Sequence, residues 1–210
     1  MLENILVLTH SSIKIKNSKT IYFDPFKIDK NYNDADYIFI THSHYDHYSE
    51  EDIKKVRKKE TKIIITSDLK ERVKELGFEN SNIIIVNPNE KYIIDTLKIE
   101  TIPAYNNKKQ FHPKSNNWVG YIIEINGENY YIAGDTDITE ENKKIKCDVA
   151  LLPIGGTFTM NYEEAAELAN IIKPKIVIPI HYGSIVGNKC DAEKFKKLIN
   201  KEIKCEIKLK

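Results

Sequence analysis

The order of apolar and polar residues predicts a β-rich start to the chain. Short apolar runs at 4–8, 12–15 and 20–23 have strand character, and SIKIK alternates as a half-buried antiparallel strand does. The run YIFI at 37–40 is continuously apolar, which is typical of a strand buried on both faces. It leads directly into THSHYDH, so we expect the histidines of this segment to lie in a loop beyond a strand end.

Strands and helices alternate in the next part of the chain. Ser49 and Asp52 have capping-box spacing and predict a helix over 52–59, with the basic residues of 54–59 on its solvated face. A strand at 62–66, a helix over 68–76 that Gly77 ends, and strands at 82–86, 91–95 and 97–101 follow. The polar segment 103–117 contains two prolines and predicts a long loop.

The second half predicts a hairpin and then a strand, helix, strand and helix. Strands at 118–125 and 130–133 flank Asn126-Gly127, a strong hairpin signal, and a further strand covers 148–154. Asn161 and Glu164 can cap a helix over 163–172, which ends before Pro174. A strand at 175–180 precedes a last helix from about Asp191. These elements predict two sheets packed together with helices outside, and no repeat or linker divides residues 1–210, so we expect one domain.

Composition narrows the class of protein. The chain has 210 residues, of which 41% are hydrophobic and 30% charged, values typical of a globular protein. Its net charge of +1 provides no overall field for nucleic acid or an anionic membrane. The first residues lack the pattern of a signal peptide and no apolar run is long enough to span a membrane, so we expect a cytoplasmic protein. Cys147, Cys190 and Cys205 are odd in number and widely spaced, which favours reduced thiols.

The candidate metal ligands are most closely spaced in His42-Ser43-His44-Tyr45-Asp46-His47. This segment contains three of the six histidines of the chain. In an extended segment, residues two apart point the same way, so His42 and His44 can direct their imidazoles at one point. Asp46 and His47 can address a second point nearby. Imidazole nitrogens and carboxylate oxygens suit Zn²⁺, and also Fe²⁺ or Mn²⁺, and leave positions open for water. The segment therefore predicts a metal site.

Two further candidate ligands follow predicted strands in the same way. Asp135 comes after the strand that ends in YYIA, and His181 comes after KIVIPI. Gly-Asp alone is a common turn dipeptide, but the loops after adjacent strands can open at one edge of a sheet. Three strand ends that each deliver a ligand favour a shared site.

At this point HSHYDH resembles the HxHxDH signature of the metallo-β-lactamase superfamily. The similarity continues along the chain, in order, through THSS, DPF, IPAYN, GDTD, LLPIGG, TMNYEEAA and PIHYG. It is greatest for the lactonase-like branch, which includes ascorbate-6-phosphate lactonase-like proteins. The resemblance implies an α/β (α+β) fold, a four-layer αβ/βα sandwich of two mixed β-sheets flanked by helices. It also implies a dinuclear centre in which His42 and His44 bind one metal, Asp46, His47 and His181 bind the other, and Asp135 bridges them.

The sequence departs from the family after Pro103-Ala104, where many members carry a third histidine for the first metal. Here Tyr105 and Asn106 follow. Either Asn106 or His112, which lies in the same loop, supplies the missing ligand, or the first site is weak and the protein works with one metal.

His10 and Asp24 are two further candidates for the site. His10 resembles part of a Gly-His-(Ala/Ser)-Ser segment near the start of related sequences, so it either lines the mouth of the active site or is a structural residue at a strand end. Asp24 is expected to orient a ligating imidazole through the second ring nitrogen.

These residues predict a hydrolase that uses a metal-bound hydroxide, with Asp46 and Asp135 as catalytic residues and one or two Zn²⁺ ions, or Mn²⁺ or Fe²⁺, as cofactor. The resemblance favours a lactone or another ester-like small molecule as substrate, with no membrane partner and homo-oligomerisation left open. The alternatives are a nucleic-acid phosphodiesterase, which the balanced charge disfavours, an iron-containing oxidoreductase, and a non-catalytic metal- or ligand-binding protein.

Overall fold

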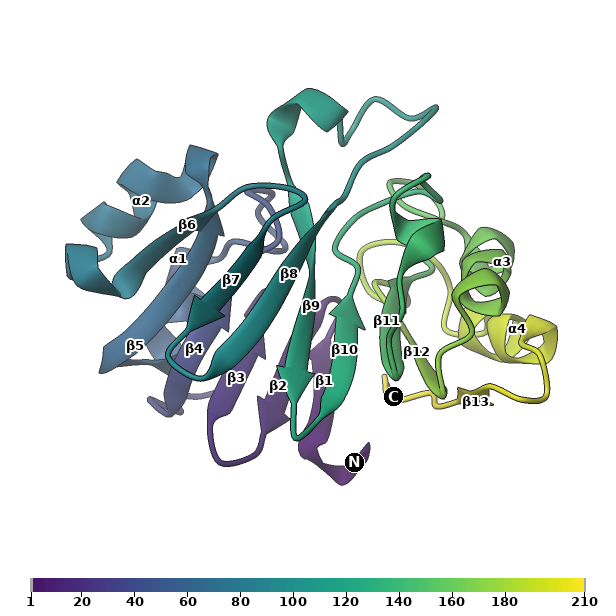
Figure 1. Ribbon diagram of the computed structural model, residues 1–210, viewed down its shortest axis with the longest axis horizontal. Coiled ribbons are helices and arrows are strands. Elements are labelled where there is room, and N and C mark those ends of the chain that lie inside the picture. The colour runs from purple at the N-terminus through teal and green to yellow at the C-terminus, as the bar shows by residue number, and fades with distance from the viewer. Residues whose placement is uncertain (1, 210) are drawn as a thin grey trace. The chain divides into compact units, whose positions relative to one another are not determined.

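The computed structural model describes residues 2–209. The chain forms two compact units, the first ending at Val86 and the second beginning at Asn87 (Figure 1). Each unit is built on its own β-sheet, and each is described here by itself.

The first unit contains a six-stranded mixed sheet whose strands lie in sequence order. Neighbouring strands are antiparallel from β1 to β3 and parallel from β3 to β6. The strands are β1 (Ile5–Thr9), β2 (Ser12–Lys16), β3 (Thr20–Phe23), β4 (Ala35–Phe39), β5 (Arg57–Thr66) and β6 (Ile83–Val86). The predicted antiparallel start is therefore confirmed, and β4 is buried as its apolar run predicts.

Short helices precede β1 and connect β4 to β5 and β5 to β6. They are η1 (Leu2–Asn4), α1 (Glu50–Val56), η2 (Ser67–Leu69), α2 (Lys70–Glu75) and η3 (Asn80–Asn82). The Ser49 side chain caps α1 by accepting a hydrogen bond from the Asp52 backbone N–H. Ile53 of α1 and Val73 of α2 are fully buried in one apolar cluster with strand residues such as Ile38. Burial of these apolar faces holds the helices to the sheet.

The predicted helix over 52–59 is wrong at its end. Helix α1 ends at Val56, and Arg57, Lys58 and Lys59 belong to β5 instead of a solvated helix face. The backbone of Arg57 is extended and pairs with Ala35 of β4. The Arg57 guanidinium also donates to the carbonyl oxygen of Gly77 at 3.1 Å and stacks over the ring of Phe78. Tertiary pairing thus overrides the helical tendency of this basic run.

The second unit contains a seven-stranded mixed sheet in the order β13-β12-β11-β10-β9-β8-β7. Neighbours are antiparallel from β7 to β10 and parallel from β10 to β13. The strands are β7 (Lys91–Ile94), β8 (Leu97–Pro103), β9 (Val119–Ile125), β10 (Glu128–Ile132), β11 (Val149–Pro153), β12 (Ile176–Ile180) and β13 (Lys204–Cys205). Asn126 and Gly127 form the predicted hairpin turn with positive φ.

Helices α3 (Tyr162–Ile172) and α4 (Asp191–Leu198) lie beside each other in the second unit (Figure 1). Two short 3₁₀ helices, η4 (Lys114–Asn116) and η5 (Asn142–Lys144), lie in its loops. The predicted cap of α3 is confirmed, because Asn161 and Glu164 form a reciprocal capping box. Helix α3 presents buried apolar residues such as Leu168 along one side, so it lies against apolar neighbours.

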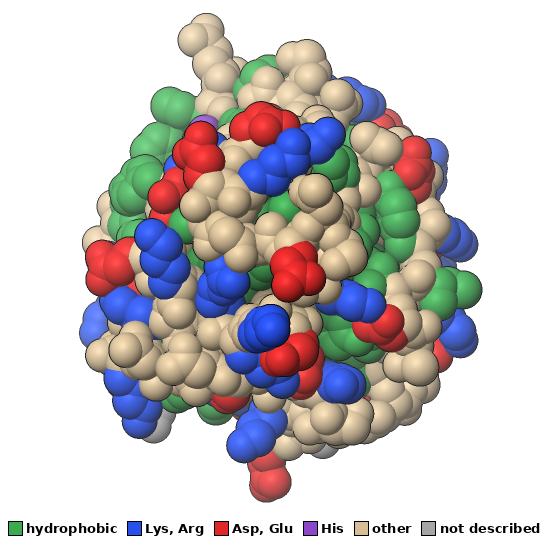
Figure 2. Space-filling view, turned by 90° about the vertical axis from the view of Figure 1, so that its left-hand side faces the viewer, with side chains coloured by type: hydrophobic (Ala, Val, Ile, Leu, Met, Phe, Trp, Pro, Cys, Tyr) green, Lys and Arg blue, Asp and Glu red, His purple; other side chains and the backbone are tan. Residues whose placement is uncertain are grey.

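The two mixed sheets with their helices confirm the predicted α/β fold class. The expectation of one domain stays a prediction. Among residues 2–209, no helix combines the length and apolar character that crossing a bilayer requires. On the face shown in Figure 2, Lys and Arg side chains lie interspersed with Asp and Glu, as the net charge of +1 leads one to expect.

Candidate metal centre

The candidate ligands of the first unit follow the carboxyl ends of adjacent parallel strands. Asp24 comes directly after β3, and the segment from Thr41 to His47 follows β4. In open α/β sheets this end of the strands is where ligands bind, because the loops there gather side chains from several strands. The sheet order therefore explains how a residue at 24 reaches residues at 41 and 47.

His42 and His44 meet at their ring nitrogens, with His42 Nε2 and His44 Nδ1 3.1 Å apart. The other ring nitrogen of His42, Nδ1, lies 3.0 Å from the Thr41 hydroxyl. That hydroxyl donates to Asp24 Oδ2 at 2.7 Å, so its oxygen can accept the Nδ1 hydrogen of His42. The arrangement fixes the tautomer in which Nε2 of His42 carries the lone pair.

His47 is held in the same manner by Asp24, whose Oδ2 lies 2.7 Å from His47 Nδ1. Thr41 donates both its backbone N–H and its hydroxyl to the Asp24 carboxylate. Burial raises the pKa of Asp24, although the bonds from His47 and Thr41 favour its charged form. With Nδ1 donating to Asp24, the Nε2 atom of His47 presents a lone pair.

Asp46 lies between two imidazoles of the first unit. Its Oδ2 is 3.0 Å from His10 Nε2 and 3.7 Å from His47 Nε2. His10 is fully buried, so its ring is a fixed partner of the Asp46 carboxylate. The structure thus brings Asp24, His42, His44, Asp46 and His47 together and adds His10 to them.

In the second unit, two imidazoles converge on the carboxylate of Asp135. Asp135 follows β10 and His181 follows β12, and these strands flank the parallel strand β11. Asp135 Oδ2 lies 3.1 Å from His181 Nε2 and 3.3 Å from His112 Nε2. All three side chains are at most 3% exposed.

Asn106 faces the opposite side of the His112 ring. Its Oδ1 accepts a hydrogen bond from the His112 backbone N–H at 3.1 Å and lies 3.0 Å from His112 Nδ1. Its Nδ2 donates to Asp137 Oδ1 at 3.1 Å and to the Phe158 carbonyl oxygen at 3.0 Å. Asn106 therefore contacts the imidazole, while His112 Nε2 is the atom that reaches Asp135.

Three of the candidate residues have left-handed backbone conformations, which cost energy for side chains other than glycine. The φ angles are 49° at His10, 43° at Asp24 and 59° at His181. Each residue directly follows the last residue of a strand, where the chain turns sharply. Such strain is retained where the surrounding structure and the function require it.

The chemistry of these donor sets fits a cation. His112 donates its Nδ1 hydrogen to Asn106, so its Nε2 directs a lone pair toward the anionic oxygen of Asp135. The Nε2 atom of His181 lies 3.1 Å from the same oxygen. Electron-rich atoms this close in a buried place repel one another unless a proton or a metal ion lies among them. Imidazole nitrogen and carboxylate oxygen are also the ligands that Zn²⁺ and Fe²⁺ take in proteins.

Two residues of this arrangement were not predicted from the sequence. Thr41 bonds both Asp24 and His42, and Asp137 bonds Asn106. Each is one or two positions from a predicted ligand, Thr41 before His42 and Asp137 after Asp135. Their positions beside predicted ligands are the sequence signal that could have identified them. Thr and Asp are common in turns for other reasons, however, so this signal is weak.

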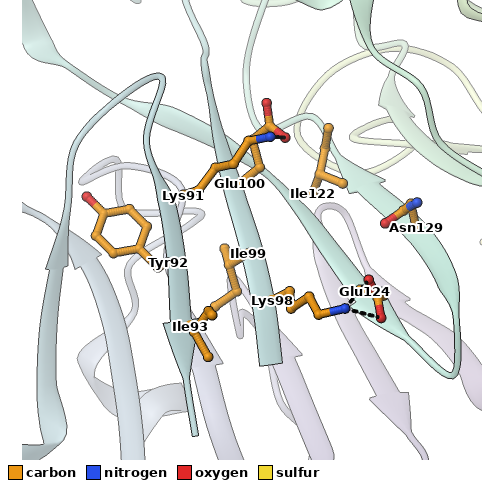
Figure 3. Close-up of a pocket in the computed structure, with 9 residues that line it drawn as sticks. All are labelled: Lys91, Tyr92, Ile93, Lys98, Ile99, Glu100, Ile122, Glu124 and Asn129. Atoms are coloured by element: carbon orange, nitrogen blue, oxygen red, sulfur yellow. Dashed lines mark hydrogen bonds and ion pairs between the residues drawn. The ribbon is translucent and has the colours of Figure 1, made fainter. Parts of the chain in front are cut away.

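A pocket lies elsewhere in the second unit, on β7, β8, β9 and β10 (Figure 3). Its charged side chains form ion pairs, such as that of Lys98 Nζ with Glu124 Oε2 at 3.1 Å. Its lining contains no histidine or cysteine. The pocket therefore offers none of the imidazole donors that the candidate centre provides.

The fold and the candidate donors together define a class of α/β proteins with a His- and Asp-rich cluster beyond the ends of parallel strands. The family model described as "Beta-lactamase superfamily domain" matches residues 4–181. The chain belongs to the metallo-β-lactamase superfamily.

Relatives agree along almost the full length of the chain. A metal-dependent hydrolase of Pyrococcus abyssi is 32% identical over 216 residues, covering 95% of this chain and 93% of that protein. The crystal structure of a putative metal-dependent hydrolase from Parabacteroides distasonis has a TM-score of 0.82 and 31% identity, covering 98% and 93% of the two chains. A metallo hydrolase from Ignicoccus hospitalis has a TM-score of 0.79 and 25% identity, covering 97% and 93%.

Proposed function

We propose that this protein is a metal-dependent hydrolase that acts on a lactone or another ester-like small molecule. One observation carries the proposal: buried imidazole and carboxylate groups converge at strand ends, with His181 and His112 both within 3.3 Å of the Asp135 carboxylate. The names of the relatives, metal-dependent hydrolases, support the same class of activity.

The proposed ligands come from both units of the chain. In the first unit they are His42, His44, Asp46 and His47, and in the second they are Asp135 and His181. We propose that these groups bind one or two ions, which are Zn²⁺ or alternatively Mn²⁺ or Fe²⁺.

His112, and not Asn106, is the proposed replacement for the missing third histidine. Both polar ends of the Asn106 amide are already engaged, its nitrogen by Asp137 and Phe158 and its oxygen by His112. His112 Nε2, in contrast, faces Asp135 directly. An imidazole whose other nitrogen donates to an oxygen is the usual arrangement of a metal-bound histidine.

A divalent cation held by the proposed ligands would supply a water of lowered pKa and would polarise the carbonyl group of the substrate. The protein's own carboxylates then have separate tasks. Asp46, supported by His10, orients the attacking water and accepts a hydrogen bond or proton from it. Asp135, whose Oδ2 lies within 3.3 Å of the His112 and His181 imidazoles, completes the ligand set with them.

Aromatic side chains next to the ligands favour an organic substrate. In the first unit, the ring of Tyr45, which is 67% exposed, packs edge-on against Phe26. In the second unit, Phe111, which is 47% exposed, packs edge-on against Phe158. Exposed rings beside a polar centre provide apolar contact area for a substrate's carbon skeleton.

The test combines metal analysis with a substrate panel. Untagged protein is analysed for metals, stripped with a chelator, reloaded with Zn²⁺, Mn²⁺ or Fe²⁺, and assayed with lactones, thioesters and phosphodiesters. We expect hydrolysis of lactones or esters that is lost on stripping and restored on reloading. Asp135→Asn is expected to lower both the metal content and the rate of hydrolysis by about 10²-fold.

Asp148→Asn is the matched control, because Asp148 is an acid of the same unit that bonds the Asn129 backbone and Lys175. It should bind metal and hydrolyse substrate as the unaltered protein does. Full activity of the stripped protein, or an Asp135→Asn variant with normal metal content and rate, would contradict the proposal.

A further inference from the structure

Asp137 is a buried acid that the proposed chemistry does not use. It is 7% exposed and lies two residues beyond Asp135 in the loop after β10. Its carboxylate accepts three hydrogen bonds, from Asn106 Nδ2 at 3.1 Å, from the Asn107 backbone N–H at 3.0 Å and from Lys109 Nζ at 2.7 Å. All three donors belong to the irregular loop that carries His112.

The bond to Asn106 determines which way its amide points. Asp137 Oδ1 and the Phe158 carbonyl oxygen can only accept, so the Asn106 side-chain nitrogen must face them. The Asn106 oxygen must then face His112, where it accepts from the backbone N–H. A flipped amide would set its oxygen against two other oxygens and its nitrogen against that N–H.

The orientation of the amide determines the tautomer of His112. Asn106 Oδ1 lies 3.0 Å from His112 Nδ1 and can only accept, so Nδ1 carries the hydrogen. The lone pair of the neutral ring is then on Nε2, the atom that lies 3.3 Å from Asp135 Oδ2. The opposite tautomer would place a hydrogen where a metal ligand needs a lone pair.

We propose that Asp137 is a positioning residue that acts through Asn106 to hold His112 in its metal-binding tautomer and orientation. The inference rests on the proposed function, because it takes His112 as a ligand. Partners of this kind commonly change metal affinity by roughly 10- to 100-fold when they are removed.

The experiment measures metal affinity by competition of Zn²⁺ with a chromophoric chelator, and the ligand-field spectrum of the Co²⁺-loaded protein. We expect Asp137→Asn to weaken metal binding by about 10- to 100-fold and to alter the Co²⁺ spectrum. Asn106→Ala should have a similar effect, and it leaves Asp137 with its bonds to Asn107 and Lys109. The double variant should be little worse than either single variant, because the residues act in series.

Glu141→Gln is the matched control for loss of a loop tether. Glu141 holds the same loop, because it accepts hydrogen bonds from the Tyr105 hydroxyl at 2.8 Å and from Lys114 Nζ at 2.7 Å, and neither bond involves Asn106 or His112. Its Zn²⁺ affinity and Co²⁺ spectrum should match those of the unaltered protein.

The outcomes separate this inference from the proposed function. If the unaltered protein binds no metal, the proposed function itself fails. If it binds metal and hydrolyses substrate but Asp137→Asn and Asn106→Ala keep its affinity and spectrum, only the role of Asp137 is refuted. Equal loss in Glu141→Gln would show that loop tethering alone is responsible, which also overturns the positioning role.

Discussion

Gly155 leaves room for His181, and replacing it with alanine tests the centre directly. A Cβ atom at Gly155 would lie 2.5 Å from the His181 carbonyl oxygen, 2.6 Å from Val186 Cγ2 and 3.0 Å from His181 Nδ1. Ordinary contacts of this kind begin at 3.4 Å. The backbone of His181 must therefore retreat by nearly 1 Å, because a carbonyl group cannot rotate away as the tip of a flexible side chain can.

The expected consequence is large for metal binding and moderate for folding. Binding sites tolerate displacements of about 0.5 Å, and a shift of about 1 Å can cost on the order of 10²-fold in function. Crowding of a packed region typically costs about 1–3 kcal/mol in the free energy of unfolding. Gly155→Ala should therefore bind Zn²⁺ about 10- to 100-fold more weakly and still fold.

Zn²⁺ affinity is measured by chelator competition, and the free energy of unfolding by urea denaturation of the metal-free protein. Gly127→Ala is the control, because Gly127 has φ +78° in the β9–β10 turn and a Cβ there meets nothing within 4 Å. It should lose about 1–2 kcal/mol through backbone strain and keep its metal affinity. Unchanged affinity in Gly155→Ala would refute the placement of His181 in the centre.

Two other predictions concern groups outside the centre. Lys114 is the main cause that lowers the pKa of Glu141 to about 2, so the stability that this carboxylate contributes should be present at pH 7 and lost between about pH 4.5 and 2. Urea denaturation across that range should show the gap between Glu141→Gln and the unaltered protein closing; a constant gap would contradict this. Burial raises the pKa of Cys147 to about 12 and of Cys205 to about 11, so native alkylation at pH 8, followed by mass spectrometry, should label exposed Cys190 first.

Local patterns in the sequence predicted the elements that present the candidate ligands. The buried run before His42 is β4, and the strands before Asp135 and His181 are β10 and β12. These predictions succeeded because strand periodicity and hairpin signals depend on neighbouring residues. The end of α1 at Val56 was not predictable in this way, because Arg57 extends to pair with Ala35, far away in the sequence.

The choice between Asn106 and His112 also lay beyond sequence patterns. The two residues are six positions apart in a loop without regular structure, and nothing periodic fixes where either side chain points. In the structure, the Asn106 amide is set by Asp137 and by the Phe158 carbonyl oxygen, a contact that spans 52 residues. Such side-chain networks join residues that only folding brings together, so they cannot be deduced before the positions of the loops are known.

In both units an imidazole Nδ1 donates to an oxygen atom, but the accepting groups differ in chemistry. In the first, the Nδ1 hydrogen of His47 goes to a carboxylate, Asp24, and in the second that of His112 goes to a neutral amide, Asn106. A carboxylate makes its imidazole more basic and a stronger ligand than an amide does. If both rings bind metal as proposed, the cation held by His47 should therefore be retained more tightly, and the one held by His112 should be the first to leave on chelation.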